Sequence, residues 1–381
     1  MKNTLKLFGV LGCCMALFAA SSYELKSTPY YTTDDLRAIY SSGNTDSWPK
    51  PHIDSTVINF REIGILGEMS FPDDNPFSEE KKELGKTLFF DPRLSGSQQI
   101  SCASCHDPEL GWADGRRVSY GHDRQQGVRN AKTILNVGYA EVIMWDGRAP
   151  TLEEQVLLPM NDTRELNIHP EIAAKNIAKI KGYRPLFKNA FGDEEVTIER
   201  IAKAIATFER TVVSRKSKFD RFVSGDSKVY TDQEVQGLQL FRTKARCINC
   251  HNGPNFSDGQ LHNAGLTYFQ RKYQDLGLYE ITKNLADIGK FKTPTLRELK
   301  LTAPYMHNGL FPHLRGVINM YNAGMPNLKP RLGQEDDPMF PKTSELLKEL
   351  HLTEEEISAL EAFLLTLSTN NFRETIPTMP K

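Results

Sequence analysis

The chain has 381 residues, of which 47 are basic and 48 acidic, so its formal net charge is -1 at pH 7. This balance leaves no basic stripe that could neutralise phosphates, which argues against a nucleic-acid partner. With 39% hydrophobic and 25% charged residues, the composition is that of a folded protein with enough apolar residues for two cores. No apolar run reaches about 18 residues, so a membrane-spanning transporter or channel is excluded.

The first 20 residues are predicted to be a leader. Lys2 and Lys6 precede an apolar segment that runs from Leu7 to Ala20. This pattern is typical of a secretory signal peptide, and residues 10–13 (V-L-G-C) also have the form of a lipobox with Cys13 as the lipidated residue. Both interpretations predict a periplasmic protein, and the second predicts a lipoprotein anchored through Cys13. The alternative is an uncleaved hydrophobic N-terminus.

Residues 21–77 are rich in Ser, Thr, Pro and Asp and contain the W-P-K-P segment at 48–51. Such a composition predicts an irregular arm or tether that contributes to no core. Helical periodicity begins near Ser78, where a capping sequence precedes Leu84, Leu88 and Phe89. We therefore place the start of the first domain at residue 78 and its end at residue 225.

Four cysteines follow the leader, as two C-x-x-C pairs that are each followed at once by histidine. This is the attachment signature of a c-type haem. A helical turn puts the two thiols on one side, where each can form a thioether, and the histidine can bind the iron as proximal ligand. A dithiol redox pair or a zinc ion held by four thiolates would need neither histidine. The sequence thus predicts two covalent haems, attached through Cys102, Cys105 and His106 and through Cys247, Cys250 and His251.

The remaining periodic segments predict a mostly α fold. Apolar residues recur at three and four over 172–191 and 198–222, which predicts amphipathic helices. Segment 83–89 resembles 235–241, which indicates an internal duplication, and a last helix is predicted over 353–367 with a capping box at Thr353 and Glu356. We expect two cytochrome c-like haem domains, the second over 226–367, with long loops at 107–131 and 252–297 and a tail over 368–381.

Residues 78–367 resemble the bacterial dihaem cytochrome c peroxidases and their relative MauG. Beyond the two haem motifs, the resemblance rests on five short segments: Gly121-His122, Arg129-Asn130-Ala131, Trp145-Asp146-Gly147-Arg148-Ala149, Phe208-Glu209-Arg210-Thr211 and Leu301-Thr302-Ala303-Pro304-Tyr305-Met306-His307-Asn308-Gly309. The resemblance implies that the first haem performs peroxide chemistry and that the second transfers electrons.

The resemblance also assigns roles around the first haem. His122, sixteen residues beyond His106, matches a histidine that can occupy the distal position. Glu165 matches the residue that moves a proton between the peroxide oxygens, and Gln155 matches its hydrogen-bonding partner. From the residues alone, Glu153 and Glu154 are equally eligible for the catalytic role, and His122 could be an ordinary loop residue.

Further matches concern the space between the haems. Trp145 corresponds to an indole that can relay an electron, although such a residue is more often part of a core. Asn130, Thr302 and Pro304 match the calcium ligands of the family, and their oxygen atoms are of the kind that calcium prefers.

The distal ligand of the second haem departs from the usual pattern. The peroxidases usually have methionine fourteen residues after the histidine at 307, whereas this chain has Tyr321, as MauG does. A phenolate stabilises ferric iron, and a thioether favours ferrous iron. Met320 and Met325 are close in sequence, so a methionine ligand stays open.

Three functions follow from these observations. The first is a peroxidase that reduces hydrogen peroxide to water with electrons from a small cytochrome c or cupredoxin. The second is a MauG-like enzyme that oxidises residues of a partner protein. The third is an electron carrier without catalysis, in which His122 stays bound. The resemblance also implies a homodimer.

Overall fold

The structure is a computed structural model that describes residues 31–369 and 374–381. The predicted leader, with Cys13, lies outside these residues. The fold is mostly helical, as the sequence predicted, and the described residues also contain a small two-stranded antiparallel sheet. Within 31–369 and 374–381, no helix is long and apolar enough to cross a membrane. The helices are α1 (Thr33–Tyr40), α2 (Glu79–Phe89), α3 (Leu152–Asn161), α4 (Pro170–Ala178), α5 (Tyr183–Phe191), α6 (Ile198–Thr211), α7 (Lys218–Val223), α8 (Asp232–Arg242), α9 (Tyr279–Thr282), α10 (Leu314–Asn322) and α11 (Glu354–Leu365), and the strands are β1 (Leu261–Asn263) and β2 (Lys290–Lys292).

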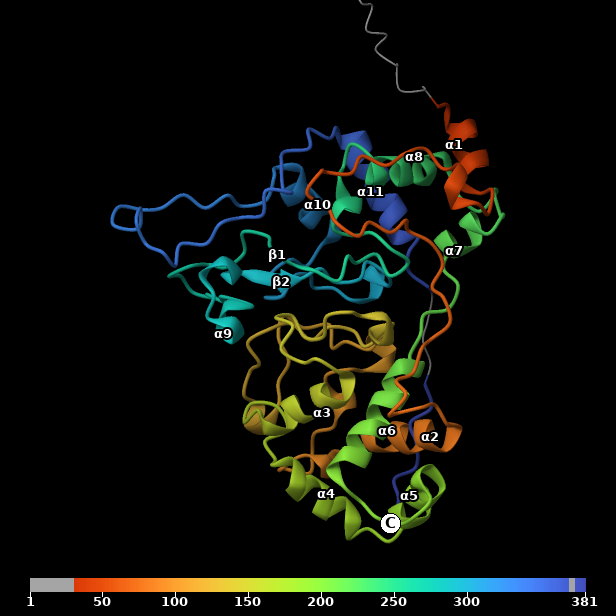
Figure 1. Cartoon of the computed structure of the whole chain (residues 1–381), viewed down its shortest axis with the longest axis vertical. Coiled ribbons are helices and arrows are strands. Elements are labelled where there is room, and N and C mark those ends of the chain that lie inside the picture. Colours follow the sequence, from red (N-terminus) through yellow and green to blue (C-terminus); the bar gives the residue numbers. More distant parts are fainter. Residues whose placement is uncertain (1–30, 370–373) are drawn as a thin grey trace, which may run out of the picture.

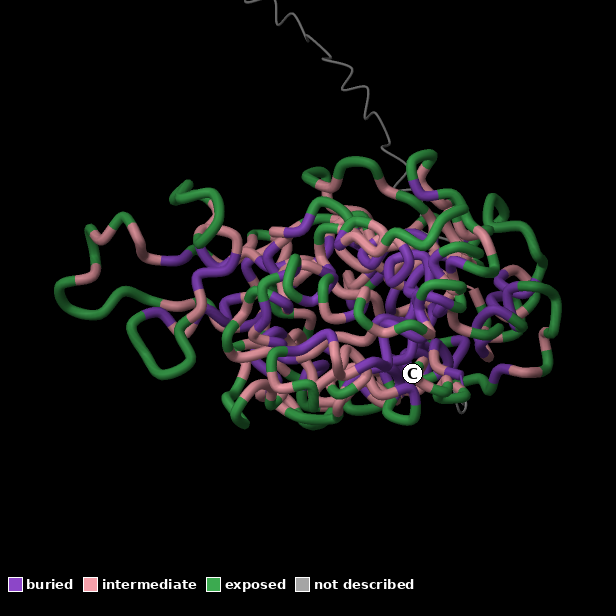
Figure 2. The backbone as a smooth tube through the Cα atoms, turned by 90° about the horizontal axis from the view of Figure 1, so that it is seen from below, coloured by how far each residue is buried: buried purple, intermediate pink, exposed green. Residues whose placement is uncertain are grey.

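The helices gather into two halves, each with its own hydrophobic core (Figure 1). Helices α2 to α6 form the first half, and α1, α7, α8, α10 and α11 form the second, with β1, β2 and α9 on the side of the second half. Buried backbone runs through the interior, while exposed turns lie at the periphery (Figure 2). The segment between α10 and α11 projects beyond the body of the second half.

A closely packed helix pair forms the centre of each half, and a glycine permits each crossing. A Cβ atom at Gly85 of α2 would lie 1.8 Å from the carbonyl oxygen of Ala204 in α6. A Cβ atom at Gly237 of α8 would lie 2.0 Å from the carbonyl oxygen of Ala359 in α11. Both glycines occupy the same position of the repeated segments 83–89 and 235–241. The structure therefore supports the predicted duplication.

The aromatic residues one turn further along repeat the same contact. The rings of Phe89 and Phe208 lie 5.4 Å apart, and those of Phe241 and Phe363 lie 5.2 Å apart. All four rings are almost fully buried. Such tilted aromatic pairs contribute both apolar burial and a favourable edge-to-face arrangement.

The prediction that residues 21–77 contribute to no core is wrong for their described part. Tyr40, Trp48 and Ile63 are buried in the core of the second half. The rings of Tyr40 and Trp48 lie 5.0 Å apart in a T-shaped pair. Both contact the guanidinium of Arg242, which is buried and paired with Glu62. The few apolar anchors are widely spaced in a polar segment, so composition could not indicate their burial.

Each of the two long helices predicted before the second motif is divided in the structure. The first becomes α4 and α5, because the turn at Gly182 packs against the end of the chain, where its amide donates to the Lys381 carbonyl at 2.8 Å. The second becomes α6 and α7, since residues 212–217 are not helical and two of them, Val212 and Ser214, are hydrogen-bonded to Asn136. The predicted last helix is confirmed as α11, with the capping box of Thr353 and Glu356.

Candidate functional site

The first C-x-x-C-H motif forms one tight turn. Residues Cys102–Ser104 are a 3-10 helix, and the amide of His106 donates to the Cys102 carbonyl at 3.0 Å. Neither thiol is in a disulfide. Burial raises the pKa of Cys102 well above its ordinary value and that of Cys105 to about 11. The two thiols are therefore neutral, and the turn presents them together as a haem attachment requires.

The imidazole of His106 is held in one orientation by the core. Its Nδ1 lies 3.2 Å from the carbonyl oxygen of Trp112. Because a carbonyl can only accept, Nδ1 carries the proton and the lone pair of Nε2 is available for a metal. Trp112 packs in turn on Phe89 at 5.9 Å and on Phe208 at 5.8 Å. The helix crossing of the first half thus orients the proximal ligand.

The second motif has the same construction. The amide of His251 donates to the Cys247 carbonyl at 2.9 Å, and its Nδ1 lies 3.0 Å from the carbonyl oxygen of Phe256. The Phe256 ring packs on Phe241, with centroids 5.9 Å apart. Phe256 therefore has the role in the second half that the indole at 112 has in the first. Burial raises the pKa of Cys247 to about 12.

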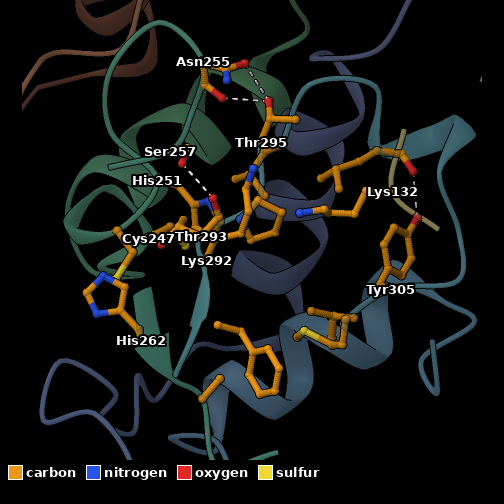
Figure 3. A pocket seen from close by; sticks show the side chains of 18 of the residues that line it. Lys132, Cys247, His251, Asn255, Ser257, His262, Lys292, Thr293, Thr295 and Tyr305 are labelled. Carbon is orange, nitrogen blue, oxygen red and sulfur yellow. Dashed lines mark hydrogen bonds between the residues drawn. The ribbon is translucent and has the colours of Figure 1, made fainter. Parts of the chain in front are cut away.

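A cavity of about 450 Å³ opens beside the second motif (Figure 3). Cys247, Cys250 and His251 line one side of it. Most of the remaining lining is apolar, which suits a porphyrin ring, and the thiols and the imidazole supply the donors that a c-type haem needs. The aliphatic lining includes Ala245, Leu266, Leu296, Val317, Ile318 and Leu350.

Tyr321 lines this cavity. It is one of three candidates for the distal ligand of the second haem, together with Met320 and Met325. Burial, followed by the charges of Cys250 and Cys247, raises the pKa of Tyr321 well above its ordinary value. Neither Met320 nor Met325 is among the residues that line the cavity. On helix α10, the lining residues Leu314, Val317, Ile318 and Tyr321 follow the spacing of one helix face, and Met320 is not part of that face. The geometry favours Tyr321 as the distal residue, and the ligand itself stays a prediction.

His122 and Glu165 lie together, as the catalytic prediction requires. The amide of His122 donates to the Glu165 carbonyl at 2.9 Å. The preceding Gly121 is packed so tightly that a Cβ there would lie 2.1 Å from the Arg164 carbonyl oxygen. Among the described residues, the buried Nδ1 of His122 has no hydrogen-bond partner. The loop is thus fixed through its backbone, and the imidazole has one weak contact among the described residues, from Nε2 to the Asp123 carboxylate at 3.4 Å.

The structure separates the three carboxylates that the sequence left equally eligible. Burial opposes ionisation of Glu153, but hydrogen bonds from Arg210 at 2.7 and 2.9 Å outweigh it and lower the pKa of Glu153. Glu154 is exposed. Glu165 is half-buried, and burial, followed by the charge of Asp162, raises the pKa of Glu165. Only Glu165 has the environment of a proton-transferring group.

Glu165 is also close enough to the first motif for its charge to raise the pKa of both Cys102 and Cys105. Gln155 lies half-buried on α3. Among the described residues, the Gln155 side chain makes no hydrogen bond, so its pairing with Glu165 stays a prediction.

Trp145 lies at the boundary of the two halves. Its Nε1 donates to the Asn130 carbonyl at 2.9 Å, and its ring packs edge-on against His307 at 6.3 Å. The indole also lines the cavity of the second motif. Three residues further on, the charge of Arg148 acts to lower the pKa of Glu165. The segment 145–148 therefore connects the surroundings of the two motifs.

The three predicted calcium ligands border the same cavity, and the calcium site stays a prediction. Asn130, Thr302 and Pro304 all line the cavity. The Asn130 side-chain nitrogen donates to the Arg116 carbonyl at 2.8 Å, which leaves its oxygen for a cation. The backbone N–H of Asn130 donates to the backbone carbonyl of His307 at 2.8 Å, and this hydrogen bond joins the two halves. These oxygen donors suit calcium.

Sequence reasoning missed three buried ionisable residues near the sites. Lys132 and Lys292 line the cavity, and Glu209 lies fully buried near the first motif, where burial raises its pKa to about 8. Glu209 stands inside the F-E-R-T segment and could have been noted there. Nothing in the sequence indicates that the two lysines face one cavity, because they are 160 residues apart.

Comparison with known proteins agrees with this geometry. The family model of di-haem cytochrome c peroxidase matches residues 79–228. The chain is 38% identical over 348 residues to the cytochrome-c peroxidase IdrP1 of Pseudomonas sp. (strain SCT), covering 84% of this chain and 89% of IdrP1. It is 37% identical over 314 residues to the methylamine utilization protein MauG of Methylophilus methylotrophus, covering 81% and 89%.

A solved structure shows the same fold. It is the crystal structure of a MauG-like protein associated with microbial copper homeostasis, with a TM-score of 0.71 and 32% identity. The similarity covers 83% of this chain and 95% of that protein. Two c-type haems are implied by the family, in agreement with the two motifs. The chain belongs to the dihaem cytochrome c peroxidase family.

Proposed function

We propose that the protein reduces hydrogen peroxide to water with electrons from a small electron carrier such as a cytochrome c or a cupredoxin. The observation that carries this proposal is the pair formed by Glu165 and His122 beside the first motif. An electron carrier needs no proton-transferring group at that place. The names of relatives, among them the cytochrome c551 peroxidase of Nitrosomonas europaea, point to the same reaction.

Glu165 would act as the proton-transferring residue. The haem on Cys102, Cys105 and His106 would supply the iron chemistry that cleaves the peroxide bond. Glu165 would take the proton from one peroxide oxygen and return it to the other, so that water leaves in place of hydroxide. Its raised pKa brings the carboxyl closer to the pH at which it must both accept and donate. Gln155 would orient the peroxide by hydrogen bonding.

His122 would control access of peroxide to the first haem. The loop is held through the backbone bond to Glu165, whereas Nδ1 of the imidazole has no partner among the described residues. A side chain held in this way can bind the metal or leave it at the loss of only one weak contact, the one between Nε2 and the exposed Asp123 carboxylate. We infer that His122 must leave before peroxide can bind.

Electrons would enter at the second haem, held by Cys247, Cys250 and His251, and pass near Trp145. Contact of Trp145 with the cavity, with Asn130 and with His307 supports this path. Calcium on Asn130, Thr302 and Pro304 would keep the two halves in register. We further propose a periplasmic location, anchored through Cys13 if the lipobox is used, and a homodimer.

A MauG-like oxidation of residues in a partner protein is the second candidate. The observation that favours it is the position of Tyr321, which lines the cavity beside the second C-x-x-C-H motif. A phenolate ligand would stabilise the oxidised state of that haem.

One experiment separates these functions. The holoprotein is mixed with hydrogen peroxide and a reduced small cytochrome c, and the absorbance of both proteins is followed. Prompt oxidation of the cytochrome is expected for the peroxidase. A long-lived oxidised state that does not turn over would favour the MauG-like reaction, and the absence of any spectral response would contradict both enzymes and favour a carrier.

A further inference from the structure

Two lysines from different halves of the molecule face the cavity of the second motif. Lys132 and Lys292 both line it, and Figure 3 shows them at the same cavity as His251. The Nζ of Lys292 donates to the Val142 carbonyl. The Nζ of Lys132 is buried and has no hydrogen-bond partner among the described residues. An ammonium group buried in this way is strongly unfavourable unless an anion balances it.

Among the described residues, neither lysine forms an ion pair with a carboxylate, and of the two glutamates that line the cavity Glu141 is paired with Arg61. The carboxylate whose charge acts on Lys132 is Asp146, and it is already paired with Arg129 and Arg148. Arg129 and Lys292 add further positive charge on the same side. A calcium ion bound by Asn130 would add to the positive charge around Lys132. The cavity therefore presents positive charge to whatever occupies it.

A haem in this cavity brings two propionate carboxylates as its own anions. We propose that Lys132 and Lys292 bind a propionate of the second haem and thereby help to set the reduction potential of that haem. Charge-assisted contacts of ammonium with carboxylate are the strong kind of hydrogen bond and satisfy the Lys132 Nζ directly. This inference depends on the second haem being present, and it does not depend on peroxide reduction.

Lys132 also contacts Trp145, the proposed electron relay, so a propionate bound to Lys132 would influence electron transfer. Its Nζ lies 4.6 Å from the centroid of the Trp145 ring, in a cation-π arrangement. A cation on the face of an indole opposes removal of an electron from the ring, and a neighbouring carboxylate offsets this effect. Lys132 is thus a positioning residue that stands between the haem carboxylate and the proposed relay.

The test uses holoprotein variants and needs no peroxide. Lys132→Met and Lys292→Met are compared with wild type by spectroelectrochemical titration of the second haem at neutral pH, where a propionate is ionised and the lysines can keep their charge. Loss of an ammonium group favours ferric iron, so the potential should become more negative in both variants. Lys132→Arg keeps the charge and should restore a potential close to that of wild type. Lys283→Met, with a side chain that is 64% exposed in the native chain, is the control and should leave the potential unchanged.

An unchanged potential in both methionine variants, with two haems per chain, would overturn the proposal. If neither variant retains the second haem, Lys132→Arg decides by resonance Raman spectroscopy. The propionate bending band of the second haem should then shift relative to wild type, since a guanidinium replaces the ammonium donor. An identical band in both proteins would also overturn the proposal. Activity with peroxide is measured separately, so failure here is distinguishable from failure of the peroxidase function.

Discussion

At the scale of single residues, Glu165 is the sharpest test of the proposed chemistry. Glu165→Gln keeps the shape but cannot accept a proton, so peroxidase turnover should fall by about 10²–10⁴-fold. Burial raises the pKa of Glu165, so the acid limb of the pH profile should lie above that of an ordinary glutamate and vanish in the variant. Stopped-flow oxidation of a reduced cytochrome across pH checks both expectations.

Glu154→Gln is the matched control for this change, because Glu154 is exposed on α3. It should retain wild-type turnover and the same pH profile. Similar losses in the two variants, with unaltered haem spectra, would remove Glu165 from the mechanism.

His122 tests the access step. Without its imidazole, His122→Ala should leave the first haem open, so that the protein reduces peroxide without prior reduction. The optical spectrum of the ferric protein should show loss of a six-coordinate low-spin species, and the lag before turnover should disappear. The nearby variant Arg124→Gln changes an exposed side chain, keeps the imidazole and should behave as wild type. An inactive His122→Ala protein whose first haem is still six-coordinate would contradict the assignment.

Tyr321 tests the second haem. Removal of an anionic phenolate favours ferrous iron, so Tyr321→Phe should raise the potential of the second haem and change its spectrum. Met320→Leu should leave both unchanged, since Met320 does not line the cavity. The reverse outcome would identify a methionine as the ligand.

At the scale of elements, the glycines at the two helix crossings, Gly85 and Gly237, predict similar losses of stability when either is replaced. A Cβ in Gly85→Ala or Gly237→Ala would meet backbone oxygen at 1.8 or 2.0 Å. Each change should lower the free energy of unfolding by about 1–3 kcal/mol, because two packed helices must separate. Gly316→Ala on α10 meets nothing within 4 Å and should raise it by about 0.5–1 kcal/mol. Denaturant titration of the three holoproteins measures the differences.

Helix starts could be read from the sequence because a cap is a local interaction. Thr231 and Thr353 precede Glu234 and Glu356, and both capping boxes are present. The breaks inside the predicted long helices could not be read. They depend on Lys381 and Asn136, which are distant in sequence and contact these segments only in the folded chain.

At the scale of the whole molecule, the same distinction explains which parts of the site could be predicted. A C-x-x-C-H motif is a single turn, so both haem attachments follow from local spacing. The roles of Glu165 and Tyr321 came from the resemblance, since spacing alone made Glu153 equally eligible. Lys132 and Lys292 were missed because a surface lysine and a lysine that faces a cavity look alike in a sequence.

Arg129 makes charged contacts with both halves. It bonds Asp146 within the first half and Asp275 of the second, the latter at 2.7 and 2.8 Å. Burial alone would raise the pKa of both aspartates, but Arg129 outweighs burial and lowers the pKa of each. Their stabilising effect is therefore complete above the ordinary aspartate pKa of about 3.9 and is lost as the pH falls through the lowered values.

The substitution Arg129→Met should reverse the dependence of the free energy of unfolding on pH. The buried carboxylate of Asp275 then lacks its arginine partner, whereas Asp146 keeps Arg148, and the loss of stability at neutral pH should be about 3–5 kcal/mol. Burial would raise the pKa of Asp275 above the unfolded value, so the folded variant binds more protons there and becomes less stable as pH rises. The difference from wild type should shrink towards a pH of about 4. Denaturant titrations of the holoproteins at several pH values measure it. Arg200→Met breaks an exposed pair with Asp193 and should stay within about 1 kcal/mol of wild type at every pH. A deficit for Arg129→Met that is as small, or that does not change with pH, would mean that other contacts hold the two halves together.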